Sequence, residues 1–296
     1  MSTDGLWRRC NDYLELTKPR VVTLIVFTAI VGMLLAVPGM VPLDRFVFGL
    51  AGIWLAAASA AALNHLIDRR ADAEMHRTRN RPLPTGHVTE RGALVFALLL
   101  GIVSMVMLWF LVNPLTAVLT FLSLIGYAVV YTVFLKRATP QNIVIGGAAG
   151  AAPPVLGWTA ITGELSPEPL LLFLIIFVWT PPHFWALAIH RREEYARVNI
   201  PMLPVTHGVA FTRLQIILYT VLLIVVSVLP YLIGMSGPVY LAGALILGGI
   251  FLYYTVAMRF RDDERLPLKT FGYSITYLFG LFLFLLIDHY IPLISA

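Results

Sequence analysis

Three polar residues recur every four positions at the start of the segment NHLIDRRADAEMHRTRNRPLP, residues 64–84. Asn64, Asp68 and Asp72 would share one face of an α-helix, because four residues make roughly one helical turn. The two carboxylates would then be separated by about 6 Å along the helix axis. Such a pair can bind a hard cation such as Mg²⁺, which takes few protein ligands and shares its coordination sphere with phosphate oxygens. The spacing therefore predicts a magnesium site at Asp68 and Asp72.

The same acids have an interpretation that involves no ligand. Asp68 and Asp72 could merely offset the positive charges of Arg69 and Arg70 at a solvated helix end. Charged helix ends are common where basic residues flank a membrane span. The spacing alone leaves both interpretations open, and the surrounding charged residues are needed to choose between them.

Basic residues that could bind a diphosphate follow the acidic pair. Arg77 and Arg81 could each donate two parallel hydrogen bonds to a phosphate group. Lys136 and Arg137, which follow Tyr131, could add positive charge from another segment. The alternative for this last group is a positively charged membrane anchor beside an interfacial tyrosine. If the ligand is a diphosphate, all four cations are candidates for its binding site.

A second charged segment, HRREEYARVNIPMLPVTHG (190–208), matches the first at a shift of 120 positions, which places Glu74 on Glu194 and Arg77 on Arg197. Internal similarity at a fixed spacing indicates repeated structural units. We therefore expect the two charged segments to face one cavity between the repeats. The predicted units are residues 17–135 and 137–258, followed by a ninth helix at 271–294.

The segment WTPPHFWALAIH (179–190) places Pro181, Pro182 and His183 within an apolar stretch. Prolines remove helical hydrogen bonds, and membrane helices tolerate this where neighbours or a cavity satisfy the freed groups. We therefore expect the helix to open towards a cavity here. His183 could ligate a haem iron, or it could only make a hydrogen bond inside the packed interior.

The composition shows the environment in which these residues must act. Of the 296 residues, 59% are hydrophobic and 12% are charged, whereas soluble domains have about 25% charged residues. Nine apolar segments are long enough to cross a bilayer, which takes about 20 helical residues. We predict an all-α membrane protein, a single integral-membrane domain over residues 1–296, with a central fifth span rich in Gly and Ala. The spans lie near residues 21–38, 46–67, 92–112, 114–135, 142–162, 169–190, 213–234, 238–258 and 271–294.

The basic residues predict the orientation of these spans. Of the 21 lysines and arginines, all but Arg45 fall in loops on one side of the nine-span arrangement. The positive-inside rule then places the N-terminus in the cytoplasm and the C-terminus outside. The net charge of +5 is explained by this rule and by attraction to anionic lipid headgroups, so we expect no nucleic-acid partner.

Several of these motifs together resemble one family. The segment beginning NHLIDRRAD is similar to the first Asp-rich motif, N-x-x-x-D-x-x-x-D, of the UbiA-type intramembrane prenyltransferases. The continuation MHRTRNRPLP resembles the haem O synthase branch, the protohaem IX farnesyltransferases. The stretches YTVFLKRATPQNIVIGGAAGAAPPVLGW (131–158), WTPPHFWALAI (179–189) and IPMLPV (200–205) are similar to that branch too. The second acidic motif departs from the family pattern, because Glu193-Glu194-Tyr195 replaces the usual ending Asp-Tyr.

The resemblance implies a bundle of nine helices around a central cavity in the inner membrane of a bacterial cell. It implies transfer of the farnesyl group of farnesyl diphosphate to a vinyl group of haem b, with water addition, and Mg²⁺ as cofactor. Mg²⁺ and nearby cations would stabilise the leaving diphosphate, and aromatic walls would stabilise the allylic cation. A haem A synthase or the assembly of a terminal oxidase would use the product. The implied catalytic residues are Asn64, Asp68, Asp72 and Glu194, and the implied cavity residues are Tyr131, Trp158, Trp179, His183 and Phe184.

Two other functions are compatible with parts of the sequence. One is prenylation of an aromatic acid in quinone synthesis by a UbiA-type enzyme, against which TPPHFW and TPQNIVIGGAAGA argue. The other is a transporter with a midplane site built from repeats. Clustering of the acids at one membrane face, rather than at the midplane, disfavours transport.

Overall fold

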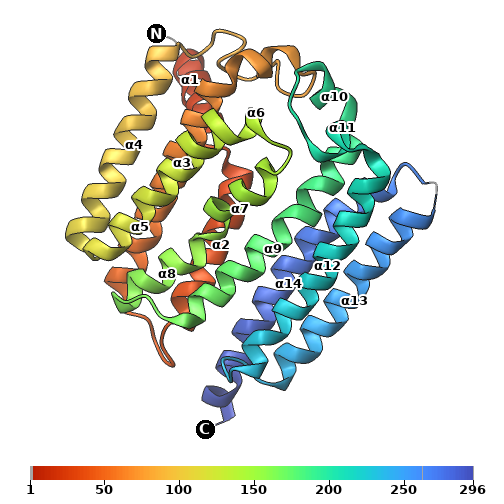
Figure 1. The fold of residues 1–296 in the computed structure, drawn as a ribbon. Helices are drawn as coiled ribbons and strands as arrows, with labels where there is room; N and C mark the ends of the chain where they lie inside the picture. Colours follow the sequence, from red (N-terminus) through yellow and green to blue (C-terminus); the bar gives the residue numbers. More distant parts are fainter. Residues whose placement is uncertain (1–2, 262, 296) are drawn as a thin grey trace.

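The computed structural model describes residues 3–261 and 263–295, and all regular structure in these two ranges is helical (Figure 1). The helices are of very different lengths, because short ones break the spans or close the loops between them. The elements are α1 (Thr3–Leu16), α2 (Pro19–Leu35), α3 (Leu43–Glu74), α4 (Glu90–Leu111), α5 (Pro114–Ile125), the π-helix η1 (Gly126–Leu135), α6 (Lys136–Ala138), α7 (Asn142–Ala151), α8 (Pro153–Thr162), α9 (Pro167–His190), α10 (Arg192–Arg197), α11 (Leu203–Thr206), α12 (Gly208–Leu232), α13 (Pro238–Phe260) and α14 (Leu266–Ser295).

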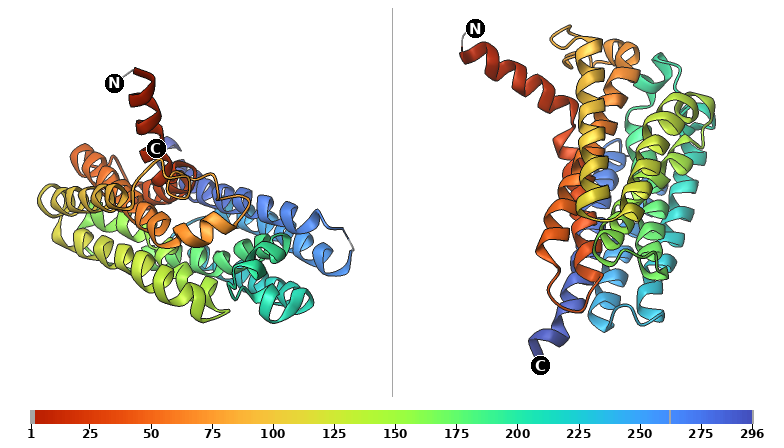
Figure 2. Two further views of the ribbon diagram at one scale, coloured as in Figure 1. Left: turned by 90° about the horizontal axis from the view of Figure 1, so that it is seen from above. Right: turned by 90° about the vertical axis from the view of Figure 1, so that its left-hand side faces the viewer.

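Eight helical segments in the described ranges are long and apolar enough to cross a membrane. A ninth is obtained when α1 and α2 are counted as one span, bent by 55° at the break between them. The predicted count of nine spans is confirmed in this sense. The first span differs from its prediction, since α2 ends at Leu35 and has only 17 residues. Figure 2 shows α1 leaving the bundle at an angle to the other helices.

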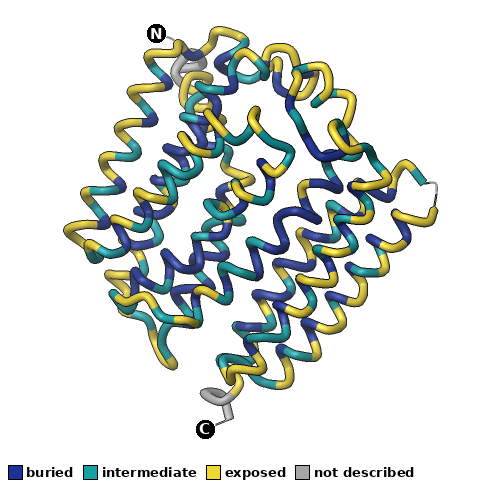
Figure 3. The backbone as a smooth tube through the Cα atoms, viewed as in Figure 1, coloured by how far each residue is buried: buried dark blue, intermediate teal, exposed yellow. Residues whose placement is uncertain are grey.

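The outer surface of the bundle is apolar along the spans. Large hydrophobic side chains such as Phe110, Leu122 and Ile246 are exposed there, and the exposed positions in Figure 3 follow the outward faces of the helices. Such a surface would be unstable in water but matches lipid tails. Together with the number of apolar helices, it identifies an integral membrane protein.

The fifth predicted span, now α7 and α8, lies in the interior as expected. Its most apolar window is 61% buried, compared with 17% for α4. Glycines explain how α8 approaches α2 so closely. A Cβ at Gly157 would lie 2.1 Å from the carbonyl oxygen of Ala29, and one at Gly32 would lie 2.2 Å from that of Pro154. Only glycine allows the two backbones to come this near.

Helix α9 differs from the prediction at its proline pair. It continues without a break from Pro167 through Pro181 and Pro182 to His190, so the expected opening does not occur. Neighbouring helices pack tightly around both prolines, which are buried. Packing of this kind holds a helix together across the missing hydrogen bonds.

The π-helical segment η1 shapes one wall of the bundle. It is wider than an α-helix, with bonds between residues five apart, such as Lys136 N–H to the Tyr131 carbonyl. The ring of Tyr131 packs against Gly146 of α7, where a Cβ would lie 2.1 Å from the ring. η1 thereby carries Tyr131 and Thr132 towards the end of α3, and α6 follows directly with Lys136.

Both charged loops lie at the same end of the bundle (Figure 1). Residues 75–89 connect α3 to α4, and residues 191–207 contain α10 and α11. The short helix α6 with Lys136 is at this end as well, whereas the later part of α14 runs to the opposite end. This arrangement brings the charged residues of three separate segments to one end of the bundle.

Candidate active site

The last three turns of α3 carry the acidic face predicted from spacing. Asn64, Asp68 and Asp72 are all in α3, and each is at most 5% exposed. Two carboxylates buried to this degree are not a solvated helix end. The interpretation that they only offset Arg69 and Arg70 is therefore wrong. Arg69 instead pairs with Glu90 at 2.5 Å.

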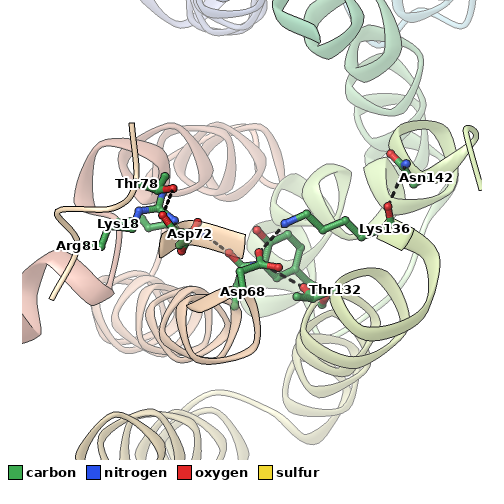
Figure 4. Close-up of polar contacts among 10 residues, drawn as sticks. Lys18, Asp68, Asp72, Thr78, Arg81, Thr132, Lys136 and Asn142 are labelled. Carbon is green, nitrogen blue, oxygen red and sulfur yellow. Dashed lines mark hydrogen bonds and ion pairs between the residues drawn. The ribbon is translucent and has the colours of Figure 1, made fainter. Parts of the chain in front are cut away.

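Asp68 is held by a cation from α6 and by an amide of its own helix (Figure 4). The ammonium of Lys136 donates to Asp68 Oδ2 at 2.5 Å, and the amide of Asn64 donates to the same oxygen at 2.9 Å. The Asn64 amide also lies 3.3 Å from the hydroxyl of Thr132. Lys136 is thus not merely a membrane anchor, because its charged end points inward to a buried carboxylate.

Asp72 organises the loop that follows α3. Arg81 donates to Asp72 Oδ2 at 2.7 Å, and the hydroxyl of Thr78 donates to the backbone carbonyl of Asp72 at 2.9 Å. These two contacts tie the loop to the end of α3, and Figure 4 shows Thr78 and Arg81 beside Asp72. The predicted diphosphate residue Arg81 therefore lies beside the predicted metal residue Asp72.

Lys18 also contacts this group of residues around Asp68 and Asp72, which we call the acidic cluster. It was not among the predicted site residues. It lies at the break between α1 and α2 with φ of 50°, a left-handed conformation that is rare for lysine. Its ammonium donates to the side-chain oxygen of Asn64. The motif TKPR contains a signal for this position, because Pro19 starts a helix and forces a turn before it.

The cluster has one feature that fits a bound cation. Asp68 Oδ1 is buried and has no hydrogen-bond partner. An unsatisfied buried carboxylate oxygen costs free energy, and a metal ion would satisfy it. In the described ranges no three His, Cys, Asp or Glu side chains come together to hold a metal. Mg²⁺ does not need such a set, because it usually binds one or two carboxylates together with waters and substrate phosphates.

His65 is a further buried residue that the sequence did not single out. It follows Asn64 on α3, is 2% exposed, and neither ring nitrogen has a hydrogen-bond partner. Lys18 and Arg81 are near enough to act on it electrostatically. A buried imidazole without partners is unusual for a purely structural residue.

The second charged loop meets the first at Arg77. Burial lowers the pKa of the Arg77 guanidinium, Arg191 and Arg81 lower it as well, and Tyr195 and Glu194 act in the opposite direction. These mutual effects require the groups to lie close together. The two charged loops therefore come near each other at these residues, while the cavity that they were expected to face stays a prediction. Arg197, by contrast, is exposed and reaches only Glu193, at 3.9 Å.

Tyr195 lies in the same contact between the loops. Burial raises the pKa of its phenol, while Arg77 and Arg191 lower it and Glu194 raises it. The hydroxyl therefore remains protonated at neutral pH and can donate a hydrogen bond.

The predicted cavity residues lie in different surroundings. Tyr131 stacks on Tyr127 at 5.6 Å, and the next residue, Thr132, contacts Asn64 of the acidic face. Trp158 is half-buried, and Phe184 is 40% exposed. Trp179 is buried in the interior, and its indole N–H donates to the carbonyl of Ser274 at 2.8 Å. Of the five predicted residues, Tyr131 has the clearest relation to the acidic face.

His183 is fixed on three sides. Its ring stacks between Trp179 at 4.1 Å and Phe271 at 4.5 Å, and its Nδ1 lies 2.6 Å from the hydroxyl of Ser274. That hydroxyl donates its single proton to the carbonyl of Phe271. Nδ1 must then be the donor towards Ser274, and Nε2 keeps its lone pair. His183 bonds a hydroxyl of α14, not a carbonyl freed by the prolines.

Arg137 is the one predicted diphosphate residue that points away from the cluster. It follows Lys136 directly, but its side chain is exposed. The four predicted cations therefore separate into Lys136 and Arg81 beside the carboxylates, Arg77 between the two loops, and Arg137 at the surface.

This fold and site correspond to a known class of protein. Residues 25–286 match the model of the UbiA prenyltransferase family. The chain belongs to the UbiA prenyltransferase family.

Within that family the similar relatives carry one name. A protoheme IX farnesyltransferase of Methylococcus capsulatus is 64% identical, over 97% of this chain and 95% of its own length. One of Thioalkalivibrio sulfidiphilus is 63% identical, over 99% of this chain and 96% of its own length.

Solved structures show the same fold at low sequence identity. A digeranylgeranylglyceryl phosphate synthase aligns with a TM-score of 0.80 at 18% identity, over 95% of this chain and 99% of its own. A UbiA homologue from Archaeoglobus fulgidus, solved with GPP and Mg²⁺, aligns with a TM-score of 0.64 at 18% identity, over 93% of this chain and 99% of its own. Mg²⁺ is therefore bound by at least one protein of this fold.

Proposed function

We propose that this chain transfers the farnesyl group of farnesyl diphosphate to a vinyl group of haem b and adds water, giving haem O and diphosphate. The observation that supports a prenyl transfer is the buried pair Asp68 and Asp72, each bonded to a cation from another segment. The choice of farnesyl donor and haem acceptor rests on relatives over 60% identical that are named protoheme IX farnesyltransferases.

Asp68 and Asp72 would hold Mg²⁺ in this reaction. Bound there, Mg²⁺ would neutralise the charge that develops on the leaving diphosphate. Lys136 and Arg81 would turn from the carboxylates to the phosphate oxygens, since both are strong donors to anions. Asn64 would keep Asp68 oriented through the hydrogen bond that joins them.

Aromatic side chains would stabilise the carbon that separates from the diphosphate. As the bond between farnesyl C1 and oxygen breaks, its electron pair leaves with the diphosphate. Tyr131 and Tyr127 would present their ring faces to the allylic cation. C1 then bonds to the terminal vinyl carbon, and water adds its oxygen to the inner vinyl carbon and releases a proton.

The chain would act in the inner membrane of a bacterial cell, with its N-terminus in the cytoplasm. Its basic loops would then lie on the cytoplasmic side. Glu194 would act from the second loop, where its carboxylate lies near Arg77 and favours the charged form of that guanidinium. A haem A synthase or a terminal oxidase would receive the product.

Mass spectrometry of extracted haem tests the proposal. Membranes containing the chain, supplied with haem b, Mg²⁺ and farnesyl diphosphate, should form a haem heavier by one farnesyl group and one water. Omitting farnesyl diphosphate should abolish it. Prenylation of 4-hydroxybenzoate with no modified haem would instead support the quinone alternative, and movement of label without a covalent product would support a transporter.

A further inference from the structure

Arg191, at the end of α9, has no anionic partner within the described residues. Its side chain is partly buried, and its Nη1 is fully buried without a hydrogen-bond acceptor. Burying part of a guanidinium without an acceptor is costly, and proteins rarely retain it without a ligand or a water. Arg191 was not among the residues predicted from the sequence to bind a substrate.

A second arginine lies beside it. Arg77 comes from the first charged loop and is close enough to Arg191 for the charge of Arg191 to lower the pKa of the Arg77 guanidinium. Neither makes an ion pair among the described residues. Tyr195 is adjacent, and as a protonated phenol it can donate a third hydrogen bond. Two unpaired arginines and a hydroxyl form a binding site for a carboxylate or phosphate group.

The diphosphate already has other cations available to it. Lys136 and Arg81 contact the carboxylates of Asp68 and Asp72, which face the proposed metal. If haem is the second substrate, as the proposed function requires, it brings two further anions. These are the propionate carboxylates on the edge of the ring away from its vinyl groups.

We propose that Arg77 and Arg191, with Tyr195, bind the propionates of haem. This assignment rests on the proposed function. It places the propionate edge at the charged end of the bundle, where carboxylates stay partly solvated. The apolar ring then extends inward with its vinyl edge towards Asp68.

The position of His183 agrees with this orientation. His183 lies near the C-terminal end of α9, and Arg191 directly follows that helix. The two are eight residues apart, which corresponds to about 12 Å along a helix axis. That distance is comparable to the reach from a propionate carboxylate to the centre of the porphyrin. A haem held at Arg191 would therefore bring its iron to the depth of His183.

Binding of haem and of haem dimethyl ester tests the assignment, because the ester lacks the propionate charges but keeps the ring, the iron and the vinyl groups. Both would be titrated by absorption into purified protein in nanodiscs, alongside farnesyl diphosphate. Arg191→Met should weaken haem binding by about ten- to a hundredfold, as expected for losing a charged hydrogen bond. Binding of the ester and of farnesyl diphosphate should not change.

Arg192→Met is the matched control, since Arg192 is the exposed neighbour in the same loop. It removes the same charge and should leave haem affinity unchanged. Arg191→Lys, which keeps the charge but loses the planar fork, should fall between wild type and Arg191→Met. Each variant is first shown to be monodisperse, and Arg191→Lys carries the test if Arg191→Met fails to fold.

If Arg191→Met loses affinity for haem and for its ester equally, the propionate site is wrong. It is also wrong if Arg191→Met loses affinity for farnesyl diphosphate and not for haem. The wild-type protein separates this failure from failure of the proposed function. If wild type makes farnesylated haem while Arg191→Met does not discriminate the ester, only the propionate site is wrong. If wild type binds no haem, both proposals are wrong.

Discussion

Two clusters of buried polar side chains lie in different parts of this bundle, and they differ in how completely they are satisfied. One joins α12, α13 and α14: the hydroxyls of Ser227 and Tyr277 are 2.7 Å apart, and Tyr240 donates to the carbonyl of Ser227 at 2.7 Å. Every polar side-chain atom of that group has a partner. The other is the acidic face of α3, where Asp68 Oδ1 and both nitrogens of His65 have none.

The difference indicates different roles. A buried network with all its hydrogen bonds made fixes how helices pack. A buried network with unused acceptors and an excess of charge is adapted to a ligand that arrives later. We therefore expect changes in the acidic cluster to affect activity more than stability, and changes in the tyrosine cluster to do the reverse.

The largest effect is expected at the carboxylates. Asp68→Asn or Asp72→Asn keeps the side-chain size but removes the charge that would hold Mg²⁺, so turnover should fall by about a hundredfold or more. Chelation of divalent cations should reduce wild-type activity in the same way, and added Mg²⁺ should restore it. Turnover is measured as farnesylated haem per folded protein.

Two further variants sharpen that result. Glu90→Gln removes an exposed carboxylate near the same end and should retain activity. Asp68→Asn leaves Lys136 without its partner and should cost stability. The double variant with Lys136→Met should recover stability but not activity. Near-normal turnover of Asp68→Asn at limiting Mg²⁺ would return the pair to a structural role.

The next largest effect is expected for Lys136→Met, which keeps the apolar stem and removes the ammonium. If Lys136 turns to the diphosphate, the KM for farnesyl diphosphate should rise by about tenfold or more, as for loss of a charged hydrogen bond. The KM for haem should change little. Arg137→Met is the control, because the adjacent Arg137 is exposed. Equal effects of the two variants would mean that only general positive charge matters.

A smaller effect on turnover is expected at His183, together with a change in the absorption spectrum of bound haem. Its Nδ1 is held by Ser274 and its Nε2 keeps a lone pair, which is the arrangement of many histidine ligands to metals. We expect His183→Ala to shift the Soret band of bound haem and to retain farnesyl diphosphate binding. An unchanged spectrum would show that His183 only connects α9 to α14.

The sequence predicted what depends on local periodicity. The spans follow from apolar length, and the shared face of Asn64, Asp68 and Asp72 follows from helical spacing. It did not predict the contact of Lys18 with Asn64, which are 46 positions apart, because such contacts depend on how helices pack. His65 was missed for a similar reason, since nothing in its neighbours shows that both ring nitrogens lack partners. Helix α9 passes its prolines intact because tertiary packing outweighs the local loss of hydrogen bonds.

The smallest effect is expected in the cluster of Ser227, Tyr240 and Tyr277, in which every polar side-chain atom has a partner. A variant there tests whether this cluster contributes to stability alone. Tyr277→Phe removes one hydroxyl and leaves the ring in place, so packing is preserved. Hydrogen bonds between membrane helices contribute about 0.6 kcal/mol on average, and the loss of unfolding free energy should be near that value. Ser227 keeps its own backbone contact with Tyr240, which limits the damage. Reversible unfolding in mixed micelles measures the change, and turnover per folded molecule should equal that of wild type. A large loss of turnover with unchanged stability would contradict this comparison. The tyrosine cluster, in which every hydrogen bond is made, would then also take part in the reaction.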